Sequence, residues 1–150
     1  MFILGKHWDF MLRQIFLAVF LYAAGCLFSF SIFAQVPDTK YSDGIAYITG
    51  GVGEDEFLSI KDESRLWPIM LELSKVGKAG WGVWISSVFI KVSNVNKQEI
   101  FNAVSDGPLM LINLEPGEYD INATFEGISQ HRKIAVKFNQ ALQKTAIFWR

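Results

Sequence analysis

Apolar and polar positions alternate along much of the chain after residue 68. Between residues 118 and 125, Tyr119, Ile121, Ala123 and Phe125 alternate with polar residues, which is the period-two pattern of a half-buried strand. Comparable apolar or alternating stretches predict further strands at residues 45–49, 69–74, 83–92, 99–104, 109–113, 128–138 and 145–149. We therefore expect a mainly β protein, an antiparallel β-sandwich of about seven strands with Greek-key connections.

Two of these stretches carry a more specific expectation. The stretch 83–92 is long for one strand, and we expect it to bend near Ser86 and Ser87. In the stretch 128–138, one face of the strand is expected to be lined by Ile134, Val136 and Phe138.

One segment has a helical period instead. It follows the glycine-rich run 50–53 and starts with Glu54, Asp55 and Glu56, whose charges complement the positive end of a helix dipole. Pro68 disfavours helical geometry at the residue before it, so the helix should end there. The spacing predicts one helix over residues 54–66, with one face carrying Phe57, Ile60, Ser64 and Trp67.

The first 34 residues are different from the rest. Residues 15–33 are nearly all apolar, and Lys6 and Arg13 precede them. This is the order of parts in a secretory signal peptide, here residues 1–34 with cleavage after Ala34. The polar, turn-rich residues 35–44 are expected to be a flexible leader to a folded domain at residues 45–150.

Two other fates of the N-terminal segment fit the same sequence. The apolar run approaches the roughly 20 residues that span a bilayer, so it could stay as an uncleaved anchor. Lipidation of Cys26 is the third alternative, although it would leave an apolar tether after the lipid. All three place the folded domain outside the cytoplasm. We expect a periplasmic protein, or one anchored in the inner membrane by residues 15–33 and facing the periplasm.

The charge and the cysteine content bear on the kind of partner and on what stabilises the folded domain. Removing residues 1–34 takes away two of the 14 basic and one of the 15 acidic residues, which leaves a net charge of −2. Nucleic acid is therefore not an expected partner, since phosphate contacts need a basic excess. The single cysteine, Cys26, lies in the targeting segment, so the domain at 45–150 must be held together by its core and not by a disulfide.

Two stretches give the chain a family resemblance. The turn Ser105-Asp106-Gly107-Pro108 precedes an apolar run, and Leu114-Glu115-Pro116-Gly117-Glu118-Tyr119 leads into the alternating strand. Together they resemble the carboxypeptidase regulatory-like domains, a transthyretin-like (prealbumin-like) group of β-sandwiches. More narrowly, residues 47–56 and Phe148-Trp149 are similar to small uncharacterised periplasmic proteins of bacteria that pair one helix with such a sandwich. The resemblance covers residues 45–150 and implies an exported domain without catalytic activity.

One enzymatic branch of the transthyretin-like proteins does not fit. The hydroxyisourate hydrolases use several histidines, an arginine and a Tyr-Arg-Gly-Ser ending. Here residues 147–150 read Ile-Phe-Trp-Arg, and His131 is the only histidine after residue 34. We expect no enzyme of that branch.

A histidine, an acidic cluster and a glycine-rich run are the other candidates for a catalytic, metal or nucleotide site. His131 lies among polar residues and is expected on a solvent-facing surface. The acidic residues 54–56 could in principle serve a hydrolase or hold a cation, but consecutive helix positions fan around the axis. The run 50–53 lacks the spacing of a nucleotide-binding loop and is expected to be a tight strand-to-helix turn. We therefore predict no catalytic residue, no metal site and no cofactor.

Three tryptophans remain as a possible recognition patch. Exposed aromatic side chains can anchor a partner or stack on sugar rings, although they can equally cover a helix. The leading hypothesis is an exported, non-catalytic binding or structural module of the bacterial cell envelope, with a protein or glycan partner. The alternatives are a small hydrolase or metal-dependent enzyme that uses the acidic helix start, and an accessory domain that stabilises a partner envelope protein. The patch would consist of Trp67, Trp81 and Trp84.

Overall fold

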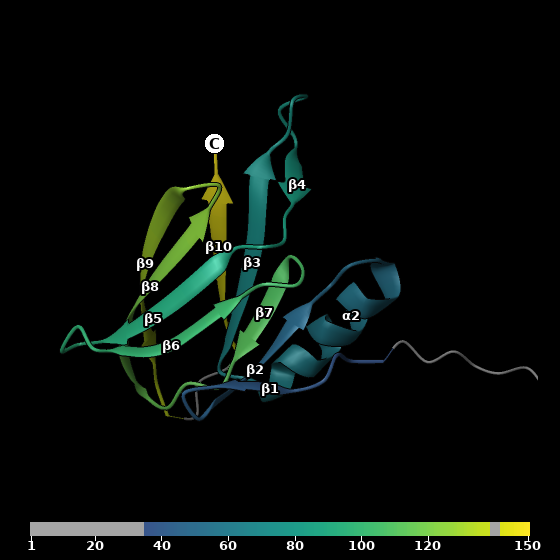
Figure 1. Ribbon diagram of the computed structural model, residues 1–150. Helices are drawn as coiled ribbons and strands as arrows, with labels where there is room; N and C mark the ends of the chain where they lie inside the picture. The colour runs from purple at the N-terminus through teal and green to yellow at the C-terminus, as the bar shows by residue number, and fades with distance from the viewer. Residues whose placement is uncertain (1–34, 139–141) are drawn as a thin grey trace, which may run out of the picture. The chain divides into compact units, whose positions relative to one another are not determined.

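A computed structural model of the protein describes residues 35–138 and 142–150 (Figure 1). The expected signal peptide and its alternatives fall on residues 1–34 and lie outside the described residues.

The described residues form two β-sheets and one helical segment. A mainly β fold with two sheets and one helix was expected, and the structure confirms it. The first sheet contains β1 (Lys40–Ser42), β2 (Ile45–Gly50), β3 (Ile69–Val76), β4 (Gly82–Trp84), β7 (Leu109–Ile112) and β10 (Gln143–Trp149). The second contains β5 (Phe89–Asn94), β6 (Glu99–Val104), β8 (Gly117–Phe125) and β9 (Ile128–Val136).

Strand β3 organises the first sheet. The sheet order is β1-β2-β7-β3-β10, and β4 also pairs with β3. Residues 69–72 of β3 pair with β7, whereas residues 74–76 pair with β4 on the stretch that β7 does not reach. On its other side β3 runs parallel to β10, from the pair Ile69–Gln143 to the pair Lys75–Trp149. The second sheet is antiparallel throughout, in the order β6-β5-β8-β9.

The main core lies between the two sheets. Alternate residues of β3 point into it, and Ile69, Leu71 and Leu73 are fully buried. From the second sheet, the core receives buried residues that include Ile90, Val92, Phe101 and Ile121. Because no described cysteine crosslinks the sheets, this apolar burial is the main source of stability in the described residues.

A second, smaller core lies on the other face of the first sheet. The helix α2 (Glu54–Glu63) and the short 3₁₀ turn η1 (Ser64–Leu66) cover the sheet there, which gives three layers (Figure 1). Ile60 of the helix is fully buried against a cluster of sheet residues that includes Ile48, Met70, Leu109 and Leu111. The helical segment thus extends over residues 54–66, as its spacing predicts.

Tight backbone packing holds the strand-to-helix turn at the end of β2. The N–H of Gly51 donates a hydrogen bond of 2.6 Å to Glu56 Oε1, so the helix side chain closes the turn. A Cβ atom on Gly107 would collide with the carbonyl group of Gly50, because the turn before β7 crosses the end of β2 there. Gly51 has φ 90°, a conformation that favours glycine, and Gly107 has no space for a side chain, so both positions favour glycine.

Three details differ from the sequence-based expectation. The described residues contain ten strands, where about seven were expected; relative to the eight stretches named from the sequence, β1 is additional and the stretch 83–92 divides into β4 and β5 at the expected bend, where Ser87 has φ 60°. The pairing of β3 with β10 is parallel, so the first sheet is not purely antiparallel. Phe138 lies beyond the end of β9 and is 84% exposed, so it does not share the inward face of Ile134.

The expected leader also contains regular structure. β1 lies within residues 35–44 and pairs with β2. Val36 packs against the helix–sheet core, and Lys40 forms an ion pair with Asp106. The folded unit therefore begins before residue 45.

Candidate functional site

The most prominent surface feature is the hairpin of residues 74–84, formed by the end of β3, a turn and β4; we call it the tryptophan hairpin. It projects beyond the body of the two sheets in Figure 1. Its turn is closed by a hydrogen bond of 2.8 Å from the N–H of Gly77 to the carbonyl oxygen of Trp81, and β4 pairs only with β3. The hairpin is therefore an ordered element with few supporting contacts.

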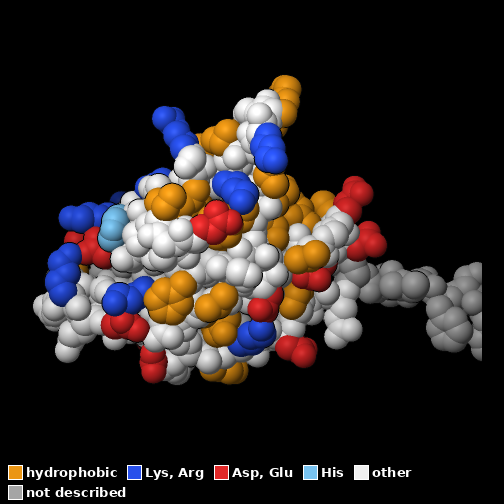
Figure 2. Space-filling model, turned by 45° about the horizontal axis from the view of Figure 1, so that its top comes forward, with side chains coloured by type: hydrophobic (Ala, Val, Ile, Leu, Met, Phe, Trp, Pro, Cys, Tyr) orange, Lys and Arg blue, Asp and Glu red, His pale blue; other side chains and the backbone are white. Residues whose placement is uncertain are grey.

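Large apolar side chains cover this hairpin. Trp81 is 78% exposed near its tip, and Val83 and Trp84 in β4 are also exposed. Figure 2 shows hydrophobic side chains at the tip of the projection, with basic side chains close by. Two exposed tryptophans within four residues form an unusual surface. The large tryptophan side chain gains much free energy when it is removed from water, so it is usually buried.

Trp84 connects the hairpin to the helix. Its ring lies 5.5 Å from the ring of Phe57 on α2, and the two are tilted by 47°. Lys61 Nζ lies over the Phe57 ring, 5.3 Å from its centroid, and it also forms an ion pair with Glu72 of β3. One side of the Trp84 ring is thus held in place while the other faces solvent.

Trp67 does not belong to the same patch. It lies just before β3 begins, whereas Trp84 pairs with Ser74 near the far end of that strand. Trp67 packs against the helix–sheet core, and its Nε1–H donates a hydrogen bond of 3.2 Å to Glu63. The structure brings Trp81 and Trp84 together on one hairpin and places Trp67 under the end of the helix.

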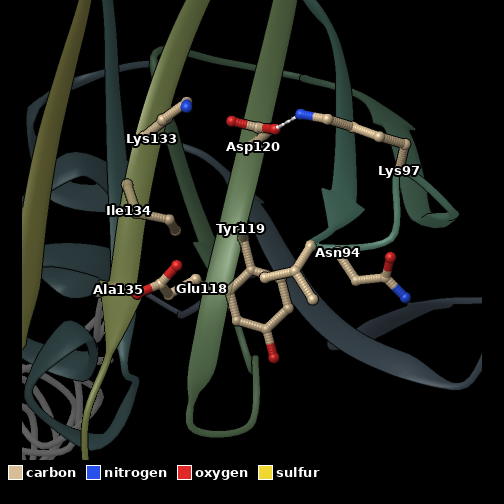
Figure 3. A pocket seen from close by; sticks show the side chains of 9 residues that line it. Asn94, Lys97, Glu118, Tyr119, Asp120, Lys133, Ile134 and Ala135 are labelled. Atoms are coloured by element: carbon tan, nitrogen blue, oxygen red, sulfur yellow. Dashed lines mark hydrogen bonds and ion pairs between the residues drawn. The ribbon is translucent and has the colours of Figure 1, made fainter.

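A second candidate surface is the outer face of the second sheet. Polar side chains from three neighbouring strands lie in register on it: Lys91, Asn122 and His131 in one row, and Ser93, Asp120 and Lys133 in the next. Two neighbouring hollows of about 480 Å³ and 550 Å³ share Lys97, Asp120 and Lys133 in their linings. Figure 3 shows these three side chains at one level, above the ring of Tyr119.

Charge is arranged in pairs across this face. The ion pair and hydrogen bond from Lys97 hold the pKa of the Asp120 carboxyl below its ordinary value, with smaller help from Lys133 and His131. Lys91 lowers the pKa of Glu99 in the same way, through a contact of 3.0 Å. Lys133 forms no ion pair with any described residue. Asn122 Oδ1 is buried and accepts no hydrogen bond from the described residues.

Sequence reasoning missed this second surface. The alternation around residue 121 shows that Asp120 and Asn122 share the outward face of a strand. It does not show that Lys97, His131 and Lys133 stand beside them, because that depends on strand order and register. Only His131 had been singled out, and it is exposed on this face as expected.

The acidic start of the helix serves local structure. Glu56 is bonded to the Gly51 backbone, while Glu54 and Asp55 are exposed at the first turn of α2. Within residues 35–138 and 142–150, no three His, Cys, Asp or Glu side chains gather as a possible metal site.

The sequence matches no protein-family model, and a search of curated proteins finds no match either. Among the residues that the structure describes, no helix has both the length and the apolar character needed to cross a membrane.

Proposed function

We propose that the protein is an exported, non-catalytic β-sandwich module of the bacterial cell envelope, which binds a partner protein through the tryptophan hairpin. The observation that carries this proposal is the exposure of Trp81 (78%) and Trp84 (52%) on one projecting hairpin. Tryptophan is enriched among the residues that dominate protein interfaces, where it fills a pocket of the partner. Aromatic side chains of this size would otherwise be expected in the core.

The geometry of the hairpin supports this role. Trp84 is backed by Phe57, so less side-chain freedom is lost when its open face is covered. β4 pairs only with β3, so its other edge offers backbone groups to an extended partner segment. A glycan partner, which could stack on Trp81, is the second outcome that a binding experiment must distinguish.

The finer fold assignment belongs to the same proposal. We infer a Greek-key sandwich of the carboxypeptidase regulatory-like type, supported by the roles of the residues in the Leu114–Tyr119 motif. Leu114 is buried, and Tyr119 Oη donates a hydrogen bond of 2.9 Å to the carbonyl oxygen of Glu115. A tyrosine that bonds back to the preceding loop in this way is typical of sandwich domains with a tyrosine corner.

The export part of the proposal rests on the composition of residues 1–34. It is tested by mass spectrometry of the protein recovered from bacterial cell fractions. A periplasmic product that starts at Gln35 supports the signal peptide, and a product that keeps residues 15–33 in the membrane fraction supports the anchor. Recovery of the full chain in the cytoplasm contradicts export.

The binding proposal is tested by photo-crosslinking of the full chain in cells. A photoreactive amino acid replaces Trp81 in one variant and the exposed aromatic Phe138 in a matched control. We expect one discrete protein adduct from position 81 that is lost when Trp84→Ser is added, and none from position 138. Equal adducts from both positions, or none from position 81 in a correctly localised protein, would contradict the hairpin as an interface.

A further inference from the structure

The hydrogen bonds around β4 show which of its backbone groups face β3. The N–H of Gly77 donates to the carbonyl oxygen of Trp81 at 2.8 Å. At the other end of the strand, the N–H of Ile85 donates to the carbonyl oxygen of Leu73 at 3.2 Å. Hydrogen-bonded residues alternate along an antiparallel pair, so Trp81, Val83 and Ile85 are the residues that direct their backbone groups toward β3.

The two remaining residues of β4 direct their backbone groups away from β3. Gly82 and Trp84 lie opposite Val76 and Ser74, at the positions of the register that carry no hydrogen bonds to β3. Their N–H and C=O groups therefore point to the other edge of β4, and no described strand pairs with that edge. All of β4 is exposed, and Figure 1 shows it at the margin of the first sheet. An open edge of this kind is a template for a further strand.

The side chains beside this edge are apolar. The exposed ring of Trp84 is held on one side by Phe57, so its open side is available to a neighbouring side chain. Val83 is exposed on the opposite face of β4. Directly opposed side chains of neighbouring strands come into contact, so an added strand with apolar residues would cover both.

The charge of the hairpin favours one kind of added strand. Residues 74–84 include Lys75 and Lys78 and no acidic residue. Lys75 forms an ion pair with Glu126, whereas Lys78 is exposed and forms no ion pair with any described residue. An acidic residue at one end of the added strand would complement Lys78.

We propose that the partner protein presents a short extended segment, apolar with a flanking acidic residue, which adds to the open edge of β4 as a further strand and hydrogen-bonds to the backbone of Gly82 and Trp84. Strand addition of this kind is a general mode of peptide recognition, in which main-chain bonds supply affinity and side chains supply specificity. This mode of binding rests on the proposed function, because it requires the tryptophan hairpin to be the interface.

Two substitutions at Gly82 test the open edge. A Cβ atom at this position meets nothing within 4 Å, so Gly82→Ala keeps the N–H group and serves as the matched control. Gly82→Pro removes the N–H group that faces the open edge, and it removes no hydrogen bond to β3. With the photoreactive amino acid at position 81, we expect Gly82→Pro to lower the yield of the protein adduct at least about tenfold and Gly82→Ala to leave it unchanged.

The adduct then supplies a probe for a second measurement. A synthetic peptide with the cross-linked partner sequence is added to the ¹⁵N-labelled full chain, and amide hydrogen exchange is followed by NMR. We expect exchange at Gly82 and Trp84 to slow at least about tenfold, while exchange at Val83 and Ile85, which already face β3, changes little. This measurement keeps the natural hairpin, so it decides the question even if Gly82→Pro fails to fold.

The outcomes separate strand addition from the hairpin interface itself. Equal adduct yields in the two Gly82 variants, or exchange at Gly82 and Trp84 that does not slow with the peptide, would overturn strand addition and leave the hairpin as the interface. An adduct with a lipid, a glycan or a second copy of this chain, in place of another protein, would overturn it as well. No adduct at all from position 81 would contradict the proposed function and strand addition together.

Discussion

The Ser42 side chain bonds to both backbone groups of Asn102. Its Oγ donates to the Asn102 carbonyl oxygen at 2.6 Å and accepts from the Asn102 N–H at 3.2 Å. Ser42 belongs to the edge strand of the first sheet, and Asn102 to the edge strand of the second. One hydroxyl therefore links the two sheets and covers an unpaired stretch of β6. Such edges otherwise invite pairing with another chain.

Replacing Ser42 with alanine removes both bonds at once. We expect Ser42→Ala to lower the free energy of unfolding by about 1–2 kcal/mol, because two partly buried backbone groups lose their partner. Urea denaturation followed by tryptophan fluorescence measures this. Ser129→Ala is the matched control, since the Ser129 hydroxyl makes a solvent-exposed hydrogen bond to the Thr124 hydroxyl and does not link the sheets. Equal losses in the two variants would show that Ser42 does not link the sheets.

The crossing of Gly107 over Gly50 predicts a large effect from one methyl group. Gly107→Ala places a Cβ against the Gly50 carbonyl and should cost about 3 kcal/mol, since rigid backbone must move on both sides. Gly82→Ala is the control, because a Cβ there meets nothing within 4 Å. Differential scanning calorimetry should show a clear drop in melting temperature for the first variant only. A neutral Gly107→Ala would mean that the two turns are not in contact.

Docking of the helix depends on one buried side chain. Ile60 is fully buried against the first sheet, whereas Leu58, two positions earlier, is 54% exposed. Ile60→Ala should lower stability by about 2–4 kcal/mol through the lost burial and the cavity left behind. Leu58→Ala should change it by less than about 0.5 kcal/mol. Amide hydrogen exchange should accelerate across residues 54–63 in Ile60→Ala alone; equal exchange in both variants would contradict this packing.

The Lys97–Asp120 pair has a defined dependence on pH. Because Lys97 lowers the pKa of Asp120 in the folded state, the contribution of this pair is complete above the ordinary carboxyl pKa and is lost as the pH falls through the lowered value. Lys97→Met should raise the Asp120 pKa toward its ordinary value. A ¹³C NMR titration of the carboxyl carbon measures the shift directly. If the Asp120 pKa stays the same in the variant, another cation holds it down.

The periodicity of the sequence was sufficient to predict most strands and the helix. Residues such as Ile69, Leu71 and Leu73 repeat every second position, and burial on one face follows from that period. It missed β1 because Lys40, Tyr41 and Ser42 are too few to show any period. It predicted the bend in 83–92, but only the structure shows that β4 and β5 belong to different sheets.

Site prediction was limited by long-range pairing. Trp81 and Trp84 are close in sequence and remain close in space, while Trp67 is separated from them by the length of β3. Lys97 and Asp120 are 23 positions apart and meet only because β5 and β8 are neighbours. Strand order of this kind depends on the whole chain and leaves no local pattern.

The parallel pairing of β10 with β3 has a consequence for the order of folding. Residues 143–149 occupy a whole side of β3, about 70 positions away from their partners. Until these residues have been synthesised, one edge of β3 has no partner strand and the main core lacks Ile147 and Trp149. The nascent chain therefore cannot complete its main core, and stays vulnerable to aggregation, until nearly all of the described sequence has been synthesised.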